Sequence, residues 1–205
     1  MKYPNFNEEK KLWKKGFKFV AGLDEAGRGP LAGPVVAAVV IIKSEKVVRS
    51  LKVNDSKKLS ENQRESIYSI LINHKDLWWG IGIVSEKVID RINILEATKL
   101  AMLRSIRQVQ RKLKGNIGYL LLDGNFKIVS EISQKSIIKG DQKVFSISSA
   151  SIIAKVTRDR IMVKYDKKYP EYGFKKHKGY PTASHRKVLK TVGQCPIHRK
   201  SFSWE

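Results

Sequence analysis

The hydrophobic positions of this chain fall into short, nearly continuous apolar runs, which alternate with segments of helical periodicity. Four of these runs have the length and composition of β-strands, and they cover residues 17–23, 34–42, 77–84 and 119–122. The run at 34–42 is apolar at every position, which is typical of a strand covered on both faces. The pattern therefore predicts a layered α/β core.

Helical periodicity predicts helices over residues 60–73, 93–113, 146–164 and 182–190. Ser60 with Gln63 makes a capping-box signature at the start of the first, and Asn93 with Glu96 gives a start signal for the second. Residues 1–16 are interpreted as a short helix or an extended arm, and 170–178 as a loop. An arginine face on the second helix is either a solvated surface, which is the usual case, or a nucleic-acid contact; it comprises Arg104, Arg107 and Arg111.

The length of 205 residues suits a single domain with a substantial core, and neither repeats nor a linker long enough to separate domains are found. Lysine and arginine number 41 against 19 acidic residues, a net charge of +22. Such an excess indicates a polyanionic partner, although generic basicity is the alternative. The lone Cys195 excludes an intramolecular disulfide and a multi-cysteine zinc site. No apolar stretch reaches the roughly 20 residues of a membrane span and no signal-peptide core is present, so we expect a cytoplasmic protein with no membrane contact.

The most informative stretch is 20–40, where an apolar run leads into Asp24 and Glu25, then Gly27-Arg28-Gly29, then a second apolar run. Adjacent carboxylates and glycines suit a divalent cation beside a phosphate, because hard cations prefer oxygen ligands and glycines allow close backbone approach. The plain alternative is a hairpin with solvated acids. The glycine spacing is GxGxxxG, which is neither the dinucleotide fingerprint nor a P-loop.

Two further acids extend this set. Asp123 ends the apolar run 119–122, and Asp141 follows Gly140 just before the predicted helix at 146. If Asp24, Glu25, Asp123 and Asp141 converge, the site would prefer Mg²⁺ or Mn²⁺ and would suit two-metal hydrolysis of a phosphodiester. Neighbouring strand residues point to opposite faces, so Asp24 and Glu25 share a site only if the strand ends or bulges there; the alternative is that Glu25 contributes its backbone carbonyl.

Six segments together carry a family resemblance. In sequence order they are LDEAGRGPLAGPV, NDSKKLS, LLLDGN, KGD before SISSASIIAKVTRDR, KGYPTASH and GQCPIHRKSF. Taken in that order they resemble ribonuclease HII, and the likeness runs from about residue 17 to about 202.

The resemblance implies a ribonuclease H-like α/β fold with a central mixed sheet flanked by helices, in which about 17–165 form the core and about 166–205 a helical part that helps to clamp the duplex. It implies cleavage of the RNA strand of RNA–DNA hybrids and incision 5′ of ribonucleotides embedded in duplex DNA, giving 3′-hydroxyl and 5′-phosphate ends. It gives the four acids the role of catalytic metal ligands for two Mg²⁺ or Mn²⁺ ions. The implied substrate-binding residues are Gly27, Arg28 and Gly29 at the 2′-hydroxyl, Tyr180 at the sugar of the RNA–DNA junction, and Lys57, Lys58, Ser149 and Lys178.

The expected partners are RNA–DNA hybrids and DNA duplexes that contain ribonucleotides. We expect a monomer, and the C-terminal residues show no recognisable sliding-clamp peptide. The related ribonuclease HIII is an alternative, but the sixteen residues before Phe17 leave no room for its additional N-terminal domain. A second alternative is a non-catalytic, basic nucleic-acid-binding protein.

Several other side chains have two interpretations. Lys155 and Arg158 are candidates for phosphate contacts, but Arg158-Asp159-Arg160 can equally form a structural ion-pair cluster. His177 and His185 could assist proton transfer, although surface or structural roles are favoured because two-metal hydrolysis does not require them. We expect structural roles for His74 and His198 and an inert thiol at Cys195.

Overall fold

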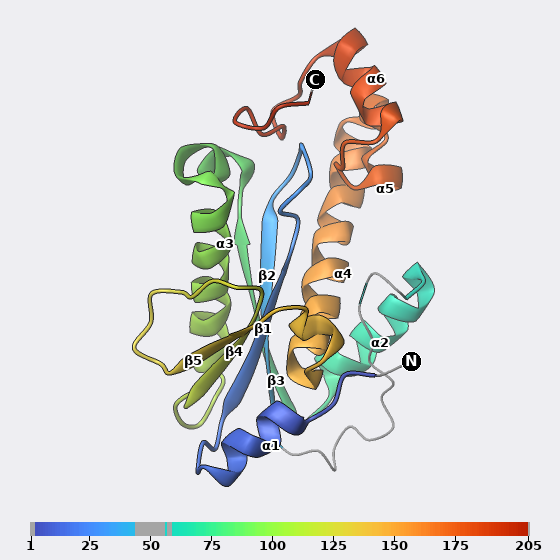
Figure 1. Cartoon of the computed structure of the whole chain (residues 1–205). Helices are drawn as coiled ribbons and strands as arrows, with labels where there is room; N and C mark the ends of the chain where they lie inside the picture. Colours follow the sequence, from blue (N-terminus) through green and yellow to red (C-terminus); the bar gives the residue numbers. More distant parts are fainter. Residues whose placement is uncertain (1–2, 44–55, 57–58, 205) are drawn as a thin grey trace.

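A five-stranded mixed sheet lies at the centre of the molecule, with its strands in the order β3-β2-β1-β4-β5 (Figure 1). The computed structural model describes residues 3–43, 56 and 59–204. The first three strands along the chain form an antiparallel meander, whereas β4 and β5 run parallel to β1. The strands are β1 (Val20–Ala26), β2 (Val35–Ile42), β3 (Leu77–Val84), β4 (Tyr119–Asp123) and β5 (Gln134–Ile137).

One long helix covers each face of the sheet, α3 (Glu86–Gln110) on one side and α4 (Phe145–Lys168) on the other (Figure 1). The apolar β2 explains this arrangement, because side chains alternate between the two faces of a strand. Val39 and Ile41 join the core under α3, whereas Val40 and Ile42 join the core under α4. The prediction of a strand buried on both faces is therefore confirmed.

Two shorter helices, α1 (Asn7–Lys14) and α2 (Glu61–Asn73), lie at the end of the sheet opposite α6 (Figure 1). The capping box predicted for α2 is present: Gln63 N–H donates to Ser60 Oγ over 3.3 Å, and Ser60 N–H donates to Gln63 Oε1 over 2.9 Å. The first sixteen residues thus include a helix, one of the two predicted forms.

The helix predicted from residue 93 begins earlier, at Glu86, and is broken at Asn93, where φ is 63° and ψ is 169°. The Asn93 carboxamide still caps the second part, since its Oδ1 accepts hydrogen bonds from Leu95 N and Glu96 N at 2.9 and 3.1 Å. The start signal was therefore real, but it marks an interruption within a longer helical segment. A cap signal at Asn93 predicts a helix start there, so it gives no indication of the helical residues 86–92 that precede it.

The C-terminal part packs against the far end of α4 (Figure 1). It contains a 3-10 turn η3 (Pro170–Tyr172), α5 (Phe174–His177) and α6 (Ala183–Val192). The prediction of a loop over 170–178 was wrong, since most of it forms these two short helical turns around the buried Tyr172 and Phe174. None of the helices in the described part of the chain combines the length and apolar character that crossing a membrane requires.

Candidate active site

Two of the predicted acids lie side by side at the carboxyl ends of parallel strands. Leu23 of β1 is paired with Leu122 of β4, so the next residues, Asp24 and Asp123, occupy neighbouring positions. Both carboxylates are held by backbone amides: Glu25 N–H donates to Asp24 Oδ1 over 2.7 Å and Gly140 N–H to Asp123 Oδ1 over 2.6 Å. The sheet thus presents two oriented carboxylates at one edge.

The third acid arrives from a separate turn. Asp141 lies in the 3-10 turn η2 (Gly140–Gln142), just before α4, and only 4% of it is exposed. One carboxylate oxygen from each of Asp24, Asp123 and Asp141 lies within 4.8 Å of the other two. The convergence expected of these three residues, which are far apart in sequence, is present.

The electrostatics of this cluster favour a bound cation. Burial raises the pKa of Asp24 well above its usual value, and the neighbouring charges of Glu25 and Asp123 raise it further, while a hydrogen bond from Ser151 opposes them. A divalent cation would relieve both the desolvation and the repulsion. The set consists of carboxylates without imidazole or thiolate, so it fits hard, oxygen-preferring ions such as Mg²⁺ or Mn²⁺.

Glu25 behaves differently from the other three acids. The strand neither ends nor bulges at these two acids, because β1 continues to Ala26 with Asp24 opposite Ala38 and Glu25 opposite Ala37. The two side chains therefore leave the strand on opposite faces. Within the described residues, the three-acid cluster does not include Glu25; its Oε1 instead lies 3.4 Å from Arg28 Nη1.

A pocket of about 510 Å³ opens beside the acid cluster. Asp24 and Glu25 form part of its wall, which continues along the Gly27-Arg28-Gly29 turn to Tyr180. An ideal Cβ built on Gly29 would lie 4.0 Å from Tyr180 Cε1, so the turn and the tyrosine are direct neighbours. The structure therefore brings the predicted substrate-binding turn and Tyr180 to the side of the predicted metal ligands.

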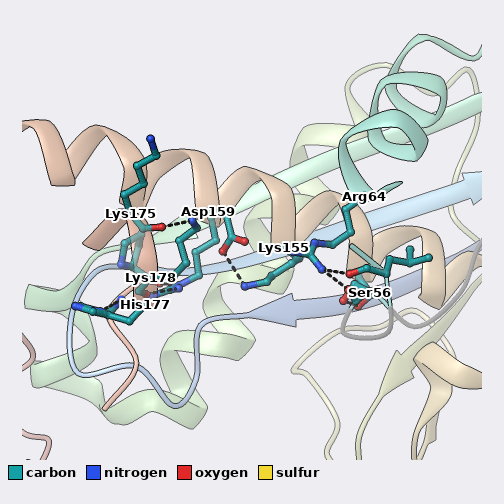
Figure 2. A network of polar contacts seen from close by, with 12 residues as sticks. Ser56, Arg64, Lys155, Asp159, Lys175, His177 and Lys178 are labelled. Atoms are coloured by element: carbon teal, nitrogen blue, oxygen red, sulfur yellow. Dashed lines mark hydrogen bonds and ion pairs between the residues drawn. The ribbon is translucent and has the colours of Figure 1, made fainter. Parts of the chain in front are cut away.

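Lys155 lies on the same wall of the pocket. Figure 2 shows its side chain beside Asp159 on α4, with Nζ 2.8 Å from Asp159 Oδ1. Its Nζ is also 5.8 Å from the centre of the Tyr180 ring. Lys155 therefore lies in the pocket and also pairs with Asp159, so the phosphate contact suggested by one interpretation of the sequence stays a prediction.

Other predicted contacts are not in this pocket. Ser149 is fully buried, and its hydroxyl donates to the Phe145 carbonyl within α4, so the prediction that it touches substrate is wrong. Two other serines line the pocket, Ser56 and Ser151, and their Oγ atoms lie 2.9 Å apart. Lys178 is outside the lining and its Nζ donates to the Lys175 carbonyl (Figure 2). Lys57 and Lys58 lie outside the described residues.

Arg158 overturns both interpretations of its sequence cluster. It is 1% exposed, so it cannot reach a phosphate, and its three hydrogen bonds to other described residues go to main-chain carbonyls, not to Asp159. Sequence reasoning also missed Arg199 of the C-terminal tail, which is fully buried beneath the Gly27-Arg28-Gly29 turn. An arginine in an ordinary polar segment carries no signal that it will be enclosed.

The histidines of the C-terminal part form a buried group, in agreement with the structural roles that the sequence favoured. His177 stacks on His185 with ring centres 4.3 Å apart, and His185 Nε2 lies 3.0 Å from His198 Nε2. Burial lowers the pKa of all three, that of His185 to about 4. None of the three is among the residues that line the pocket beside the acid cluster.

Comparison with known proteins gives a consistent result. The model of the Ribonuclease HII family matches residues 21–204. A Ribonuclease HII of Acetivibrio thermocellus is 54% identical over 195 residues, which are 95% of this chain and 73% of that protein. A Ribonuclease HII of Clostridioides difficile is 50% identical over 194 residues, again 95% of this chain and 73% of that protein.

Solved structures agree with these sequences. The ribonuclease H2 from Pyrococcus horikoshii has a TM-score of 0.71 at 33% identity, over 91% of this chain and 94% of that one. The RNase HII in the PCNA:RNase HII complex from Archaeoglobus fulgidus has a TM-score of 0.75 at 27% identity, over 91% of this chain and 96% of that one. Bst-RNase HIII in complex with Mn²⁺ shares the fold, with a TM-score of 0.64 at 17% identity, over 86% of this chain and 63% of that one. The α/β ribonuclease H-like fold predicted from the sequence is confirmed.

Proposed function

The chain belongs to the ribonuclease HII family of endoribonucleases, and on that premise we propose that it hydrolyses the RNA strand of RNA–DNA hybrids and incises 5′ of single ribonucleotides in duplex DNA, leaving 3′-hydroxyl and 5′-phosphate ends. The catalytic residues we propose are Asp24, Glu25, Asp123 and Asp141. The paralogue ribonuclease HIII, considered as an alternative, is disfavoured because its solved structures share only the fold, at 16 to 17% identity.

One observation carries the proposal: the three-acid cluster of Asp24, Asp123 and Asp141 directly adjoins a pocket lined by a glycine turn and a tyrosine. A phosphodiester placed at the acids would have its flanking sugar against Gly27-Arg28-Gly29 and Tyr180. This supports one site at which cleavage and recognition of the 2′-hydroxyl occur together, since that hydroxyl is what distinguishes RNA from DNA.

The acid cluster would hold Mg²⁺ or Mn²⁺ through Asp24, Asp123 and Asp141. Two such ions supply activation of the attacking water and stabilisation of the leaving oxygen. Glu25 would take part through its backbone carbonyl or through a shift of its side chain, since its carboxylate leaves β1 on the opposite face. The hydrogen bonds from Glu25 N–H and Gly140 N–H orient the carboxylates before any ligand arrives.

The remaining residues of the pocket would bind and orient the duplex. Backbone groups of Gly27, Arg28 and Gly29 would contact the ribose 2′-hydroxyl and neighbouring phosphates, and the Tyr180 ring would pack on the sugar at the junction. Lys155 would contact a phosphate, in exchange for part of its ion pair with Asp159. We further propose that the protein acts as a monomer in the cytoplasm, with the part after about residue 166 clamping the duplex.

The rival function is a non-catalytic, basic protein that binds duplexes by charge alone. The acid cluster argues against it, because buried carboxylates weaken the attraction of a polyanion unless a cation is bound. One incubation separates the two: a DNA duplex with a single ribonucleotide should be cut 5′ of that residue with Mg²⁺ or Mn²⁺ and remain intact with EDTA. Binding without any product would establish the rival.

Asp123→Asn provides the matched test at the level of one residue. Loss of a carboxylate from the cluster should lower metal-dependent cleavage by more than about 100-fold, given that groups merely supporting a metal ligand already contribute 10- to 100-fold. Duplex binding should persist. Glu65→Gln is the control. Glu65 lies on α2 and forms an exposed ion pair with Arg160, so this variant also removes one negative charge, but outside the acid cluster. Full cleavage by Asp123→Asn would remove this residue from the catalytic set.

A further inference from the structure

Two buried arginines hold the main chain of the pocket wall. Arg158 of α4 and Arg199 of the C-terminal tail are 1% and 0% exposed. All of the hydrogen bonds that their guanidinium groups make within the described structure go to main-chain carbonyl oxygens. Burying a charge without a paired carboxylate is costly, so these contacts are a feature that the fold maintains against a penalty.

Arg199 makes four of these hydrogen bonds. Their acceptors lie in the turn that lines the pocket, at Gly27 and Arg28, and in the segment that follows the turn, at Gly33. Its Nη1 donates to Arg28 O over 3.0 Å, and its Nη2 to Gly27 O over 2.6 Å and Gly33 O over 2.8 Å. Its Nε donates to Gly33 O over 3.0 Å. The planar fork of a guanidinium suits this pattern, whereas an ammonium group on a lysine could not reach all of these carbonyls together.

Arg158 continues the same arrangement toward Tyr180. It donates to Pro34 O, Ala32 O and Lys178 O over 2.9 to 3.0 Å, and its Cζ lies 5.9 Å from the centre of the Tyr180 ring. Backbone bonds join the same segments, from Leu31 N to Gly179 O and from Arg199 N to Leu31 O, both 2.8 Å long. The recognition turn, the Tyr180 segment and the tail therefore form one connected unit.

The direction of the carbonyls has a consequence for the opposite side of the turn. In a trans peptide the C=O and the following N–H point in opposite directions. Because the carbonyls of Gly27 and Arg28 point at Arg199, the N–H groups of Arg28 and Gly29 point away from it. These two residues line the pocket. The buried guanidinium thus fixes the orientation of two amide donors on the substrate side of the turn.

Both guanidinium groups keep their charge at neutral pH. Burial lowers the pKa of Arg199 to about 9 and that of Arg158 to about 10, both still above 7. A positive charge behind the turn adds to the field of the aligned peptide dipoles, which favours an electronegative oxygen in front of it. This arrangement would suit the oxygen atoms of a ribose and its phosphate.

We propose that Arg199, assisted by Arg158, is a positioning residue for ribonucleotide recognition, which orients the peptide groups of the Gly27-Arg28-Gly29 turn toward the substrate and couples that turn to Tyr180. The inference rests on the proposed function, because it assumes that the turn contacts the 2′-hydroxyl. It adds a role for the conformation of the C-terminal tail: the tail determines how well the turn distinguishes RNA from DNA.

The test compares Arg199→Lys with the wild-type protein in binding measurements with EDTA, where no strand is cut. The readout is the ratio of the Kd for an all-DNA duplex to the Kd for the same duplex with one ribonucleotide. Lysine keeps the positive charge but lacks the planar guanidinium with its several N–H donors. We therefore expect the ratio of the two Kd values to fall at least fivefold, toward one. The Kd for all-DNA duplex should change less than twofold. Arg160→Lys, an exposed arginine on α4, is the matched control and should leave the ratio unchanged.

The outcomes separate the inference from the function on which it rests. A wild-type protein without preference for the ribonucleotide would contradict the proposed function itself. A wild-type preference that persists in folded Arg199→Lys would overturn the positioning role, as would equal weakening on both duplexes. If Arg199→Lys does not fold, Arg199→Gln tests the same point with a neutral group that retains two amide donors. An unchanged ratio in that variant would also overturn the proposal.

Discussion

Adjacent acids in one strand have different surroundings in this protein. Asp24 faces α4 and the acid cluster, whereas Glu25 leaves β1 on the other face and lies near Arg28. A carboxylate's role is therefore determined by the face of the strand from which it projects and by the elements that meet it there. The same holds for serines of α4: Ser149 is enclosed in the helix, while Ser151, two positions later, reaches the pocket.

Tyr180 gives a prediction at the scale of one residue. The residue is 39% exposed, and its ring lies in the pocket between Gly29 and Lys155. Tyr180→Ala should lower kcat/KM for a duplex with one ribonucleotide about tenfold more than for an all-RNA hybrid strand, because only the former presents a junction with deoxyribose; a tenfold difference corresponds to about 1.4 kcal/mol. Tyr180→Phe keeps the ring and should resemble the wild type. Equal losses on both substrates would refute the junction contact.

At the scale of elements, the turn after β1 depends on a contact with α4. Gly27 has φ +100°, and a Cβ there would collide with the Arg158 side chain and lie 2.7 Å from the Pro34 carbonyl. Gly16 has a similar φ of +88° with nothing within 4 Å of its would-be Cβ. The two glycines thus differ mainly in the packing around them.

This pair provides a controlled stability measurement. Both Gly16→Ala and Gly27→Ala should suffer the strain of a positive φ. Gly27→Ala should be less stable than Gly16→Ala by a further 1–3 kcal/mol or so, because an extra methyl group is forced against a buried arginine. Urea unfolding of both variants measures the difference. Equal free energies of unfolding would show that Arg158 is not held rigidly against the turn.

The buried histidines link the C-terminal helices to pH. His185 of α6 contacts His177 of α5, His198 of the tail and the Tyr180 carbonyl. Its pKa is lowered to about 4 by burial, so between pH 6.5 and 4 the unfolded chain binds a proton that the folded protein excludes. The contribution of His185 to the free energy of unfolding is fully present above pH 6.5 and is lost as the pH falls toward 4.

We therefore expect His185→Gln to be less sensitive to acid than the wild type. Between pH 7 and 5 the free energy of unfolding of the wild type should fall by about 2 kcal/mol more than that of the variant, as one lowered histidine pKa requires. The raised pKa of Asp24 acts in the opposite direction, but it is common to both proteins and cancels. Denaturant titrations in EDTA at the two pH values measure this difference. An identical loss in both would exclude His185 as its source.

For the whole molecule, the net charge of +22 surrounds a cluster of acids. The basic residues favour association with any duplex, whereas the acid cluster and the turn determine what happens at one phosphodiester. The Kd for an all-DNA duplex should therefore rise steeply with salt, about 10³-fold between 50 and 200 mM if six phosphates are contacted. Equilibrium binding in EDTA at several salt concentrations measures the slope. A Kd independent of salt would contradict a charge-driven encounter.

The sequence alone was enough to predict four of the five described strands, the helices with clear caps and the presence of three of the metal-binding candidates, because apolar periodicity, capping side chains and acids at strand ends are local properties. It did not predict β5, since Gln134–Ile137 is not an apolar run. The sequence also indicated the family, through motifs spread along the chain. It did not determine the early start of α3 or the short helical turns between 170 and 178, where tertiary packing outweighs weak local preference.

Three features depend on the tertiary structure and could not be predicted: which acids share a cluster, the burial of Ser149, and the place of Arg158 and Arg199 behind the pocket wall. The physical reason is the same in each case. Burial and hydrogen-bond partners depend on segments more than a hundred residues apart, such as the tail of Arg199 and the turn at Gly27. A side chain's type limits the chemistry it can perform, but its surroundings determine whether it meets the substrate or supports the residues that do.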